Sequence, residues 1–579
     1  MSASTREQAI DKVLNRMSLA EKVGQCFTLS WRGSMITPSV LDVIEKLHAG
    51  GLRIEPYTTE SATATYYGRR LSDPNFTPPA DYFTISQTYF QAKHPGTYCP
   101  PAEYAARLNR LKEIAMARPS GVPLHITLDY EGDFSHDYAF GGMAMFPSQM
   151  GLSAASDPDL VYCAGRTVAE QLRAVGITMM HSPVCDVNVN AANPEIGTRS
   201  FSSDAELCAR NAVRMLEGIR DGGVVATAKH YPGRGAASAD AHEFLESIDV
   251  DRATMLAREL LPYRRLIEAG LGAVMTAHSA YPALDAPDVP ATLSRRIIHD
   301  LLRTELGFQG VVTTDAMGMG AIVKRWGIPR ACVLALKAGC NLLLVKNDEE
   351  VRTQSFFAVK QAVEKGELSE EELTASVRRV LVMKHEQGLF ADGGKADPQA
   401  AARVVGSESH RACAAEAARR AVVVLRDREH LLPLSRDRKV LVVEQMIPQE
   451  FTPNDISCNS HAFNEAMLAH SRNVVNATTE FCATDRESAL LAEVARDADT
   501  VVITNSYWRI RPQNNSELVR RLVADGRKVV VVTNTPYAPG VPAEAGTVVC
   551  AFGGGPWSLR AAAGVLYGSA RTEGILPPH

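Results

Sequence analysis

The chain has 579 residues, of which 45% are hydrophobic and 22% are charged. That composition excludes a disordered protein, and the length provides for two or more buried cores. The formal net charge of -5 and the scattered lysines and arginines exclude a basic nucleic-acid-binding surface, so we predict no nucleic-acid partner.

The N-terminal residues 1–11 are polar and charged and lack an apolar signal core. No stretch of the chain approaches about 18 uncharged apolar residues. These features predict no membrane partner and a cytoplasmic location. The eleven cysteines are scattered, without a Cys-x-x-Cys pair, and are predicted to be reduced packing residues.

Eight short apolar runs alternate with amphipathic segments of helix length through the first two thirds of the chain. This alternation predicts a parallel (β/α)8 barrel of the TIM type. The expected strands are 24–29, 50–54, 123–129, 176–184, 224–230, 272–278, 310–315 and 341–346.

A turn-rich break at 391–398 predicts a domain boundary, and a second, smaller α/β unit follows it. We expect the barrel domain at 1–390, a linker at 391–418 and a C-terminal αβα sandwich domain at 419–579. Its expected strands are 421–425, 439–443, 500–504, 528–533 and 547–551, with a helix at 516–525.

Polar residues repeatedly end the predicted barrel strands: Asp129, Lys229, His230, His278 and Asp315. Active sites of (β/α)8 barrels lie at the carboxyl ends of the strands, so these side chains are predicted to share one mouth. His278 is expected to be structural.

One short loop joins Lys-His-Tyr-Pro-Gly-Arg-Gly at 229–235 to the pair Asp240 and His242. This arrangement indicates binding of a polyhydroxylated ligand together with proton transfer. Retaining glycoside hydrolysis needs a carboxylate that attacks the anomeric carbon and a second group that donates and then accepts a proton. A histidine with a pKa of about 6.5 can serve as that second group.

These elements resemble glycoside hydrolase family 3, and more narrowly its β-N-acetylglucosaminidase branch. Members of that branch carry Lys-His-Phe-Pro-Gly-His-Gly followed by Asp-Ser-His, and a Val-Thr-Asp-Ala-Met element. The resemblance covers nearly the whole chain and implies Asp315 as the nucleophile, His242 as the acid/base and Asp240 as its orienting partner.

Further matches imply sugar-binding roles. Asp129, which opens Asp-x-Glu-Gly, resembles the carboxylate that holds distal sugar hydroxyls, and Arg199 in Gly-Thr-Arg-Ser-Phe resembles part of the hydroxyl clamp together with Lys229 and His230. Met319 is a candidate for an apolar wall under the sugar ring, with simple packing as the alternative.

The chain also departs from the family pattern. Two arginines that follow the Asp-x-Glu-Gly element are replaced, the second of them by Asp137, and Arg234 stands in place of a loop histidine. A related hexose therefore stays open beside N-acetylhexosamine. The long segment 57–104, rich in Tyr, Phe and Pro, is expected to be a loop over the mouth or a subunit contact.

The sequence therefore predicts a retaining exo-β-glycosidase that acts on a non-reducing-end β-linked N-acetylhexosamine or related hexose in a small glycoside or oligosaccharide. Two alternatives remain: a glycoside phosphorylase that uses phosphate as acceptor through the same intermediate, and a catalytically silent sugar-binding protein. We expect no cofactor and no metal, because no His/Cys cluster has ligand spacing. A homodimer is left open.

Overall fold

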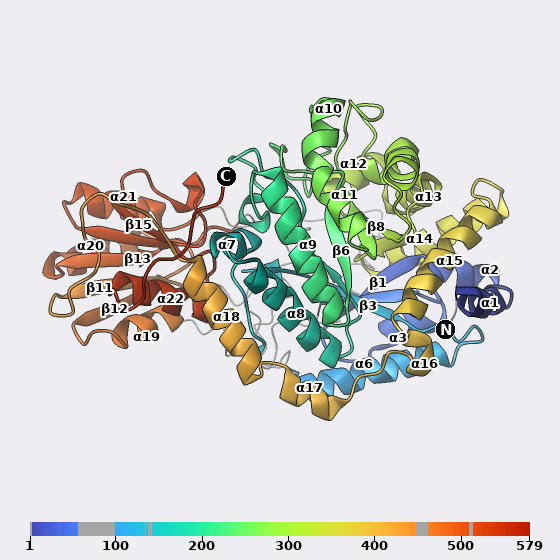
Figure 1. The fold of residues 1–579 in the computed structure, drawn as a ribbon, viewed down its shortest axis with the longest axis horizontal. Coiled ribbons are helices and arrows are strands. Elements are labelled where there is room, and N and C mark those ends of the chain that lie inside the picture. Colours follow the sequence, from blue (N-terminus) through green and yellow to red (C-terminus); the bar gives the residue numbers. More distant parts are fainter. Residues whose placement is uncertain (1–2, 56–98, 134, 137–141, 447–460, 509–512) are drawn as a thin grey trace, which may run out of the picture.

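The computed structural model describes residues 3–55, 99–133, 135–136, 142–446, 461–508 and 513–579. In the larger domain eight parallel strands form a closed ring, because β1 pairs with both β2 and β9, and β2 also pairs with β3 (Figure 1). The predicted (β/α)8 barrel is confirmed. Its strands are Phe27–Arg32 (β1), Gly51–Glu55 (β2), His125–Gly132 (β3), Met179–His181 (β5), Val225–Tyr231 (β6), Ala273–Thr276 (β7), Val311–Ala316 (β8) and Leu342–Val345 (β9).

Helices surround this ring, and short helical turns precede several of them. The α-helices are Ala3–Leu14 (α1), Leu19–Gln25 (α2), Pro38–Glu45 (α3), Pro101–Met116 (α6), Gln149–Ala154 (α7), Pro158–Ala174 (α8), Ala205–Asp221 (α9), Arg252–Thr254 (α10), Leu261–Glu268 (α11), Gly320–Trp326 (α12), Ile328–Ala338 (α13), Glu349–Glu364 (α14), Glu370–Glu386 (α15) and Leu389–Asp392 (α16). Gly197–Arg199 (η2) and Ala291–Leu293 (η4) are 3-10 turns, and Met255–Glu259 (η3) and Arg296–Glu305 (η5) are π-helical.

The barrel strands read as apolar runs because they are buried on both faces. Every residue of β6 is buried, and so is every residue of β7 and β9. One end of the barrel is closed by an apolar cluster in which strand residues meet α15. This cluster consists of Met179, Val225, Ala273, Val311, Leu342, Val380 and Met383. It leaves the opposite end, where the carboxyl ends of the strands lie, for polar side chains.

The C-terminal domain is a six-stranded sheet in the order β10-β15-β14-β13-β11-β12, covered by helices on both faces. All neighbouring strands are parallel except β10 and β15. The elements are Val423–Asp427 (β10), Val440–Gln445 (β11), Ala462–Leu468 (α19), Val474–Thr479 (β12), Asp485–Val494 (α20), Ala495–Asp497 (η7), Thr500–Thr504 (β13), Ser516–Ala524 (α21), Val529–Thr533 (β14), Ala538–Gly540 (η8), Thr547–Cys550 (β15) and Pro556–Leu566 (α22). The predicted second α/β unit is therefore confirmed, with β12 as an additional strand.

Two helices, Pro398–Val404 (α17) and Glu408–Ala421 (α18), occupy the segment predicted as a linker. Helix α18 crosses from the barrel to the C-terminal domain (Figure 1) and packs against α7, α8 and α22. Cys413 of α18 forms a disulfide with Cys163 of α8. The prediction that all cysteines are reduced is therefore wrong for this pair. The two residues are 250 positions apart, so no local spacing could reveal the pairing.

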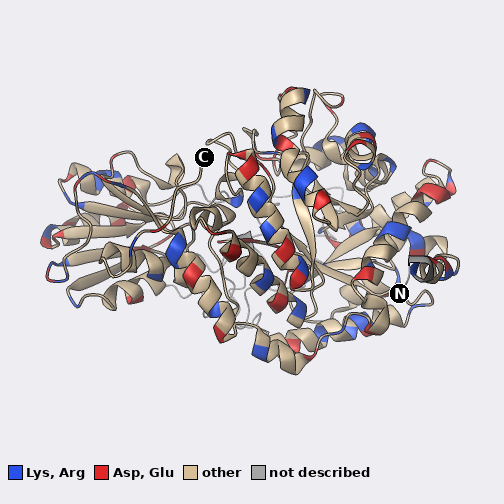
Figure 2. Cartoon of the chain, viewed as in Figure 1, with Lys and Arg blue, Asp and Glu red and all other residues tan. Residues whose placement is uncertain are grey.

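Lys and Arg residues are interspersed with Asp and Glu along the outer helices (Figure 2). Such a mixture produces no single-sign field of the kind that attracts nucleic acid, and the absence of that partner stays a prediction. Among the described residues, none of the helices combines the length and apolar character needed to span a bilayer.

Candidate active site

The polar side chains that end the barrel strands meet at one mouth. Asp129 belongs to β3, Lys229 and His230 to β6, and Asp315 to β8. Lys229 donates to Oδ1 of Asp129 at 2.6 Å, and Nε2 of His230 lies 3.9 Å from Oδ2 of Asp315. The structure therefore brings these four predicted site residues together.

The carboxylate of Asp129 is held by basic side chains from three other strands. Arg53 of β2 donates to Oδ2 at 2.5 Å, Lys229 of β6 donates to Oδ1, and Nδ1 of His181 of β5 lies 3.4 Å from Oδ1. Burial alone would raise the pKa of Asp129, but Lys229 and Arg53 hold it well below its usual range. Asp129 is therefore an anion, and its side chain is still 28% exposed at the mouth.

Glu131, two residues further along β3, links Lys229 to Arg199. Arg199 donates from Nε and Nη2 to the two carboxylate oxygens of Glu131 at 2.5 and 2.9 Å, and Lys229 forms an ion pair with the same carboxylate. Burial would lower the pKa of Lys229, yet Asp129 and Glu131 raise it above its usual value. The two cations are therefore charged and fixed in place, which suits them to bind sugar hydroxyls.

His230 is oriented by a fully buried carboxylate. Its Nδ1 lies 2.8 Å from Oδ2 of Asp186, and the backbone N–H of Arg234 donates to Oδ1 of Asp186 at 2.6 Å. The other ring nitrogen, Nε2, is 3.4 Å from Nη2 of Arg199 and faces Asp315. This pairing fixes the imidazole between the cation of Arg199 and the carboxylate of Asp315.

Asp315 lies near the end of β8, with its side chain 19% exposed. Its Oδ1 accepts the backbone N–H of Ala316 at 2.6 Å. Burial would raise the pKa of Asp315, but His230, His278 and Lys229 together lower it below its usual value. Asp315 is therefore ionised at neutral pH, as a carboxylate nucleophile must be.

His242 and Asp240 form a hydrogen-bonded pair on the loop after β6. Nδ1 of His242 lies 2.6 Å from Oδ1 of Asp240, and the imidazole is 37% exposed. The loop docks on the start of α12, directly after the strand of Asp315: Gly320 N–H donates to the carbonyl of His242 at 2.9 Å. A Cβ atom at Gly320 would lie 2.6 Å from that carbonyl oxygen, so glycine permits this close approach.

His278, which follows β7, lies between Thr292 and the end of the strand that carries Asp315. Its Nδ1 is 2.7 Å from the hydroxyl of Thr292, and its Nε2 is 3.2 Å from the carbonyl oxygen of Ala316. Burial lowers the pKa of His278 to about 4 although Asp315 opposes that change, and His242 lowers it further. His278 is therefore neutral at pH 7, hydrogen-bonded to the strand end that carries Asp315.

Met319 is buried, with 5% of its surface exposed. It packs against Ala241 and Ala321, with Leu245 and Ala316 at the edge of the same cluster. Met319 thus supports the loop that carries His242. Its predicted role as a wall under the sugar ring stays a prediction.

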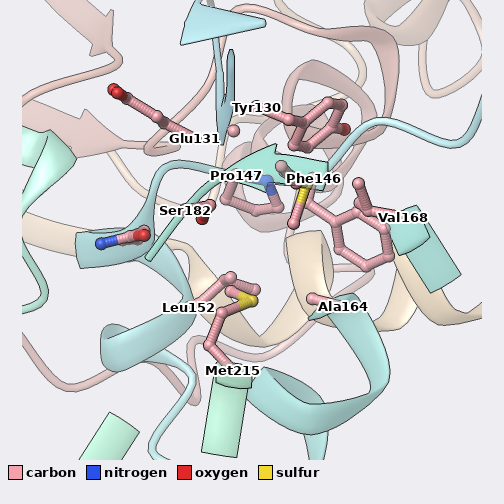
Figure 3. Close-up of a pocket in the computed structure, with 12 residues that line it drawn as sticks. Tyr130, Glu131, Phe146, Pro147, Leu152, Ala164, Val168, Ser182 and Met215 are labelled. Atoms are coloured by element: carbon pink, nitrogen blue, oxygen red, sulfur yellow. The ribbon is translucent and has the colours of Figure 1, made fainter. Parts of the chain in front are cut away.

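A separate cavity lies behind β3 and is lined mainly by apolar side chains, among them Phe146, Leu152 and Met215 (Figure 3). Glu131 also borders the cavity, but its carboxylate points away from these apolar side chains. The cavity measures about 20 Å³, which is room for about one water molecule. It is too small for a sugar ring, and the candidate site is the open mouth.

Two family models match this chain. The model of the glycosyl hydrolase family 3 N terminal domain matches residues 96–383, and that of the family 3 C-terminal domain matches residues 422–579. The chain belongs to glycosyl hydrolase family 3. The resemblance inferred from the motifs is therefore confirmed.

Relatives within the family carry hexosaminidase names. The chain is 29% identical over 411 residues to beta-hexosaminidase A of Pseudoalteromonas piscicida, covering 64% of this chain and 66% of the relative. It is 31% identical over 360 residues to a beta-N-acetylglucosaminidase/beta-glucosidase of Cellulomonas fimi, covering 59% of this chain and 61% of the relative. The chain thus spans slightly less than two thirds of the length of these relatives.

A solved structure resembles nearly the whole chain. The glycoside hydrolase family 3 beta-N-acetylglucosaminidase from Paenibacillus sp. str. FPU-7 superposes with a TM-score of 0.82 at 29% identity, covering 97% of this chain and 99% of that protein. The two-domain family 3 fold follows from these likenesses.

One group of side chains in the described part of the chain has the spacing to hold a metal ion. Ligand atoms of Glu195, Asp240 and His242 lie within 4.8 Å of one another. Asp240 is already hydrogen-bonded to Nδ1 of His242, and Glu195 is paired with Arg234. These contacts already account for all three side chains, which form one charge-paired, hydrogen-bonded group.

Several residues of the mouth were not predicted from the sequence. Arg53 and His181 lie within or at the end of barrel strands, so the strand-end pattern that indicated Asp129 could have indicated them as well. Asp186 and Glu195 lie in the loop after β5, where no periodic pattern marks them.

The C-terminal domain contacts the barrel next to the mouth. Asp133, which follows β3, accepts hydrogen bonds from Nδ2 of Asn534 and from the backbone N–H of Gly554, each at 2.8 Å. Residues 57–98 of the predicted mouth loop at 57–104 lie outside the described residues. Asp137 lies outside them as well.

Proposed function

We propose that this protein is a retaining exo-β-glycosidase that removes a β-linked N-acetylhexosamine, or a related hexose, from the non-reducing end of a glycoside. Asp315 is the nucleophile, His242 is the acid/base, and Asp240 orients His242. The observation that carries the proposal is that the ionised Asp315 ends β8, while the loop of the Asp240–His242 pair docks on the start of α12 directly after that strand, through the hydrogen bond from Gly320 N–H to the carbonyl of His242.

In the first step an oxygen of Asp315 attacks the anomeric carbon while the bond to the leaving oxygen breaks, and His242 gives its proton to that oxygen. In the second step His242 takes a proton from water, whose oxygen attacks the anomeric carbon and releases Asp315. The hydrogen bond between Asp240 and Nδ1 leaves Nε2 of His242 to carry the transferred proton.

The sugar would be held by the charged group around Asp129. Asp129, Lys229, Arg199 and His230 provide one anion, two cations and an imidazole within one connected set of contacts. Charged hydrogen bonds contribute about 1.5–3 kcal/mol each, enough to select for sugar hydroxyls. The names of the hexosaminidase relatives support an N-acetylhexosamine as the preferred sugar.

Leaving-group dependence tests this assignment. The His242→Ala variant is expected to lose about 100-fold or more in kcat/KM with a phenyl glycoside, which needs a proton donor, and little with a 2,4-dinitrophenyl glycoside. Equal losses with both substrates would contradict the acid/base role.

Phosphorolysis is the second candidate, since an imidazole acid/base repels an anionic acceptor less than a carboxylate does. Product analysis with and without phosphate separates the two activities: release of free sugar in both conditions supports the hydrolase, and a sugar 1-phosphate supports the phosphorylase. The cytoplasmic location and the absence of a cofactor stay predictions, and a homodimer is left open.

A further inference from the structure

A buried ion pair lies beneath the loop that carries Asp240 and His242. The side chains of Arg234 and Glu195 are each only 1% exposed and form a direct ion pair. Glu195 comes from the loop that precedes Arg199, and Arg234 comes from the turn after β6. The pair therefore joins two segments of the active-site mouth.

Arg234 holds the base of this loop. Its Nε donates to the hydroxyl of Ser279 at 3.0 Å, and its Nη2 lies 3.4 Å from the carbonyl oxygen of Ala239. Nη2 also lies 4.0 Å from Glu246, whose carboxylate accepts the backbone N–H of Ala239 at 3.0 Å. One guanidinium thus contacts both ends of the segment that presents His242.

Glu195 extends from this pair to the candidate acid/base. Its Oε2 accepts the backbone N–H of Ala241 at 3.3 Å, and its Oε1 lies 3.8 Å from Nδ1 of His242. The same Oε1 lies 3.9 Å from Nη1 of Arg199. Nδ1 of His242 therefore faces two carboxylates, Asp240 at 2.6 Å and Glu195 at 3.8 Å.

We propose that Glu195, held by Arg234, is a positioning residue for His242, acting with Asp240 to fix the imidazole ring and to stabilise its protonated form. This inference rests on the proposed role of His242 as the acid/base. Neither the Arg234–Glu195 pair nor a second carboxylate partner is needed for the hydrolytic scheme above, so the pair is a separate feature of this chain.

The sign of the expected effect follows from the charges around His242. Among the described residues, Asp240 and Glu195 favour the imidazolium, and the neighbouring Glu243 is exposed. Arg199 and Arg234, which both contact Glu195, oppose the imidazolium. Because glycosylation needs the protonated acid, kcat/KM falls as pH rises, and removing the charge of Glu195 moves that fall to lower pH.

The test is the pH profile of kcat/KM for the Glu195→Gln variant. Glutamine keeps the shape and an acceptor oxygen and removes only the charge. Loss of one of the two carboxylate charges near His242 disfavours the imidazolium, so with a phenyl glycoside we expect the basic limb to move down by up to about one pH unit. With a 2,4-dinitrophenyl glycoside, which needs no proton donor, kcat/KM should stay within about twofold of the wild type.

The matched control is Glu243→Gln, which removes an exposed carboxylate next to His242 in sequence and should leave the limb in place. The double variant Glu195→Gln with Arg234→Met leaves no unpaired buried charge, so it replaces the single variant if that fails to fold, and its limb should move in the same direction. An unmoved limb, or equal losses with both substrates, would overturn the proposal.

Failure of the proposed function would look different. If His242 is not the acid/base, His242→Ala itself shows equal losses with the two leaving groups. If His242→Ala behaves as expected and Glu195→Gln does not move the limb, only the positioning role of Glu195 is wrong.

Discussion

Replacing Arg234 with methionine should destabilise the barrel domain strongly. The substitution removes the nearer cation of a buried carboxylate: Glu195, 1% exposed, keeps the more distant guanidinium of Arg199 at 3.9 Å. Breaking a buried pair by removal of one partner costs about 3–5 kcal/mol of unfolding free energy, because the remaining charge stays desolvated. The hydrogen bond to Ser279 is lost as well.

A double-mutant cycle isolates the charge effect. Glu195→Gln alone keeps an acceptor for Ala241 but leaves the buried cation of Arg234 without its nearest anion, so it should also cost about 3–5 kcal/mol. In the double variant no unpaired charge is buried, so its cost should fall below the sum of the single costs by about 2–3 kcal/mol.

Equilibrium urea unfolding, followed by fluorescence and circular dichroism, measures these free energies where the two transitions coincide. Additive costs within about 0.5 kcal/mol would refute the reasoning. In that case Arg234 and Glu195 would contribute independently to stability.

Three further results are expected. Lys229→Met should lower kcat/KM by roughly 10- to 100-fold, because the ammonium that fixes Asp129 and binds hydroxyls is lost; an unchanged value would contradict the clamp. In the C-terminal domain burial raises the pKa of Glu444 to about 7. As pH rises from 4.5 to 7, the wild type should therefore lose about 3 kcal/mol of unfolding free energy relative to the Glu444→Gln variant. Urea unfolding of both proteins at pH 4.5 and pH 8 measures this change, and a difference that does not vary with pH would contradict it. Incubation with EDTA should leave hydrolysis unchanged, and a loss restored by a divalent ion would instead indicate that Asp240 and His242 bind metal.

The barrel strands could be predicted because strands buried on both faces read as uninterrupted apolar runs. The predicted run 224–230 and the observed strand Val225–Tyr231 differ by one residue at each end. Strand β12, Val474–Thr479, escaped prediction because it lies at the sheet edge, where five of its six residues are not buried and only Thr479 is. Its sequence therefore lacks the uninterrupted apolar run by which the other strands were recognised.

The residues of the candidate site also fall into a group that the sequence could predict and a group that it could not. Asp315 and Lys229 could be predicted because they end apolar strands and stand in recognisable motifs. Glu195 and Arg234 are 39 residues apart in separate loops, and only the folded barrel brings them into contact. The disulfide between Cys163 and Cys413 was missed for the same reason, since it joins helices that are distant in sequence.

The most direct test of the central claim is to trap the covalent intermediate with an activated fluorosugar and to locate it by peptide mass spectrometry. The account predicts one glycosyl group on Asp315, with no adduct formed by the Asp315→Asn variant. An adduct on another carboxylate of the mouth, or turnover without any adduct while Asp315→Asn stays active, would contradict it.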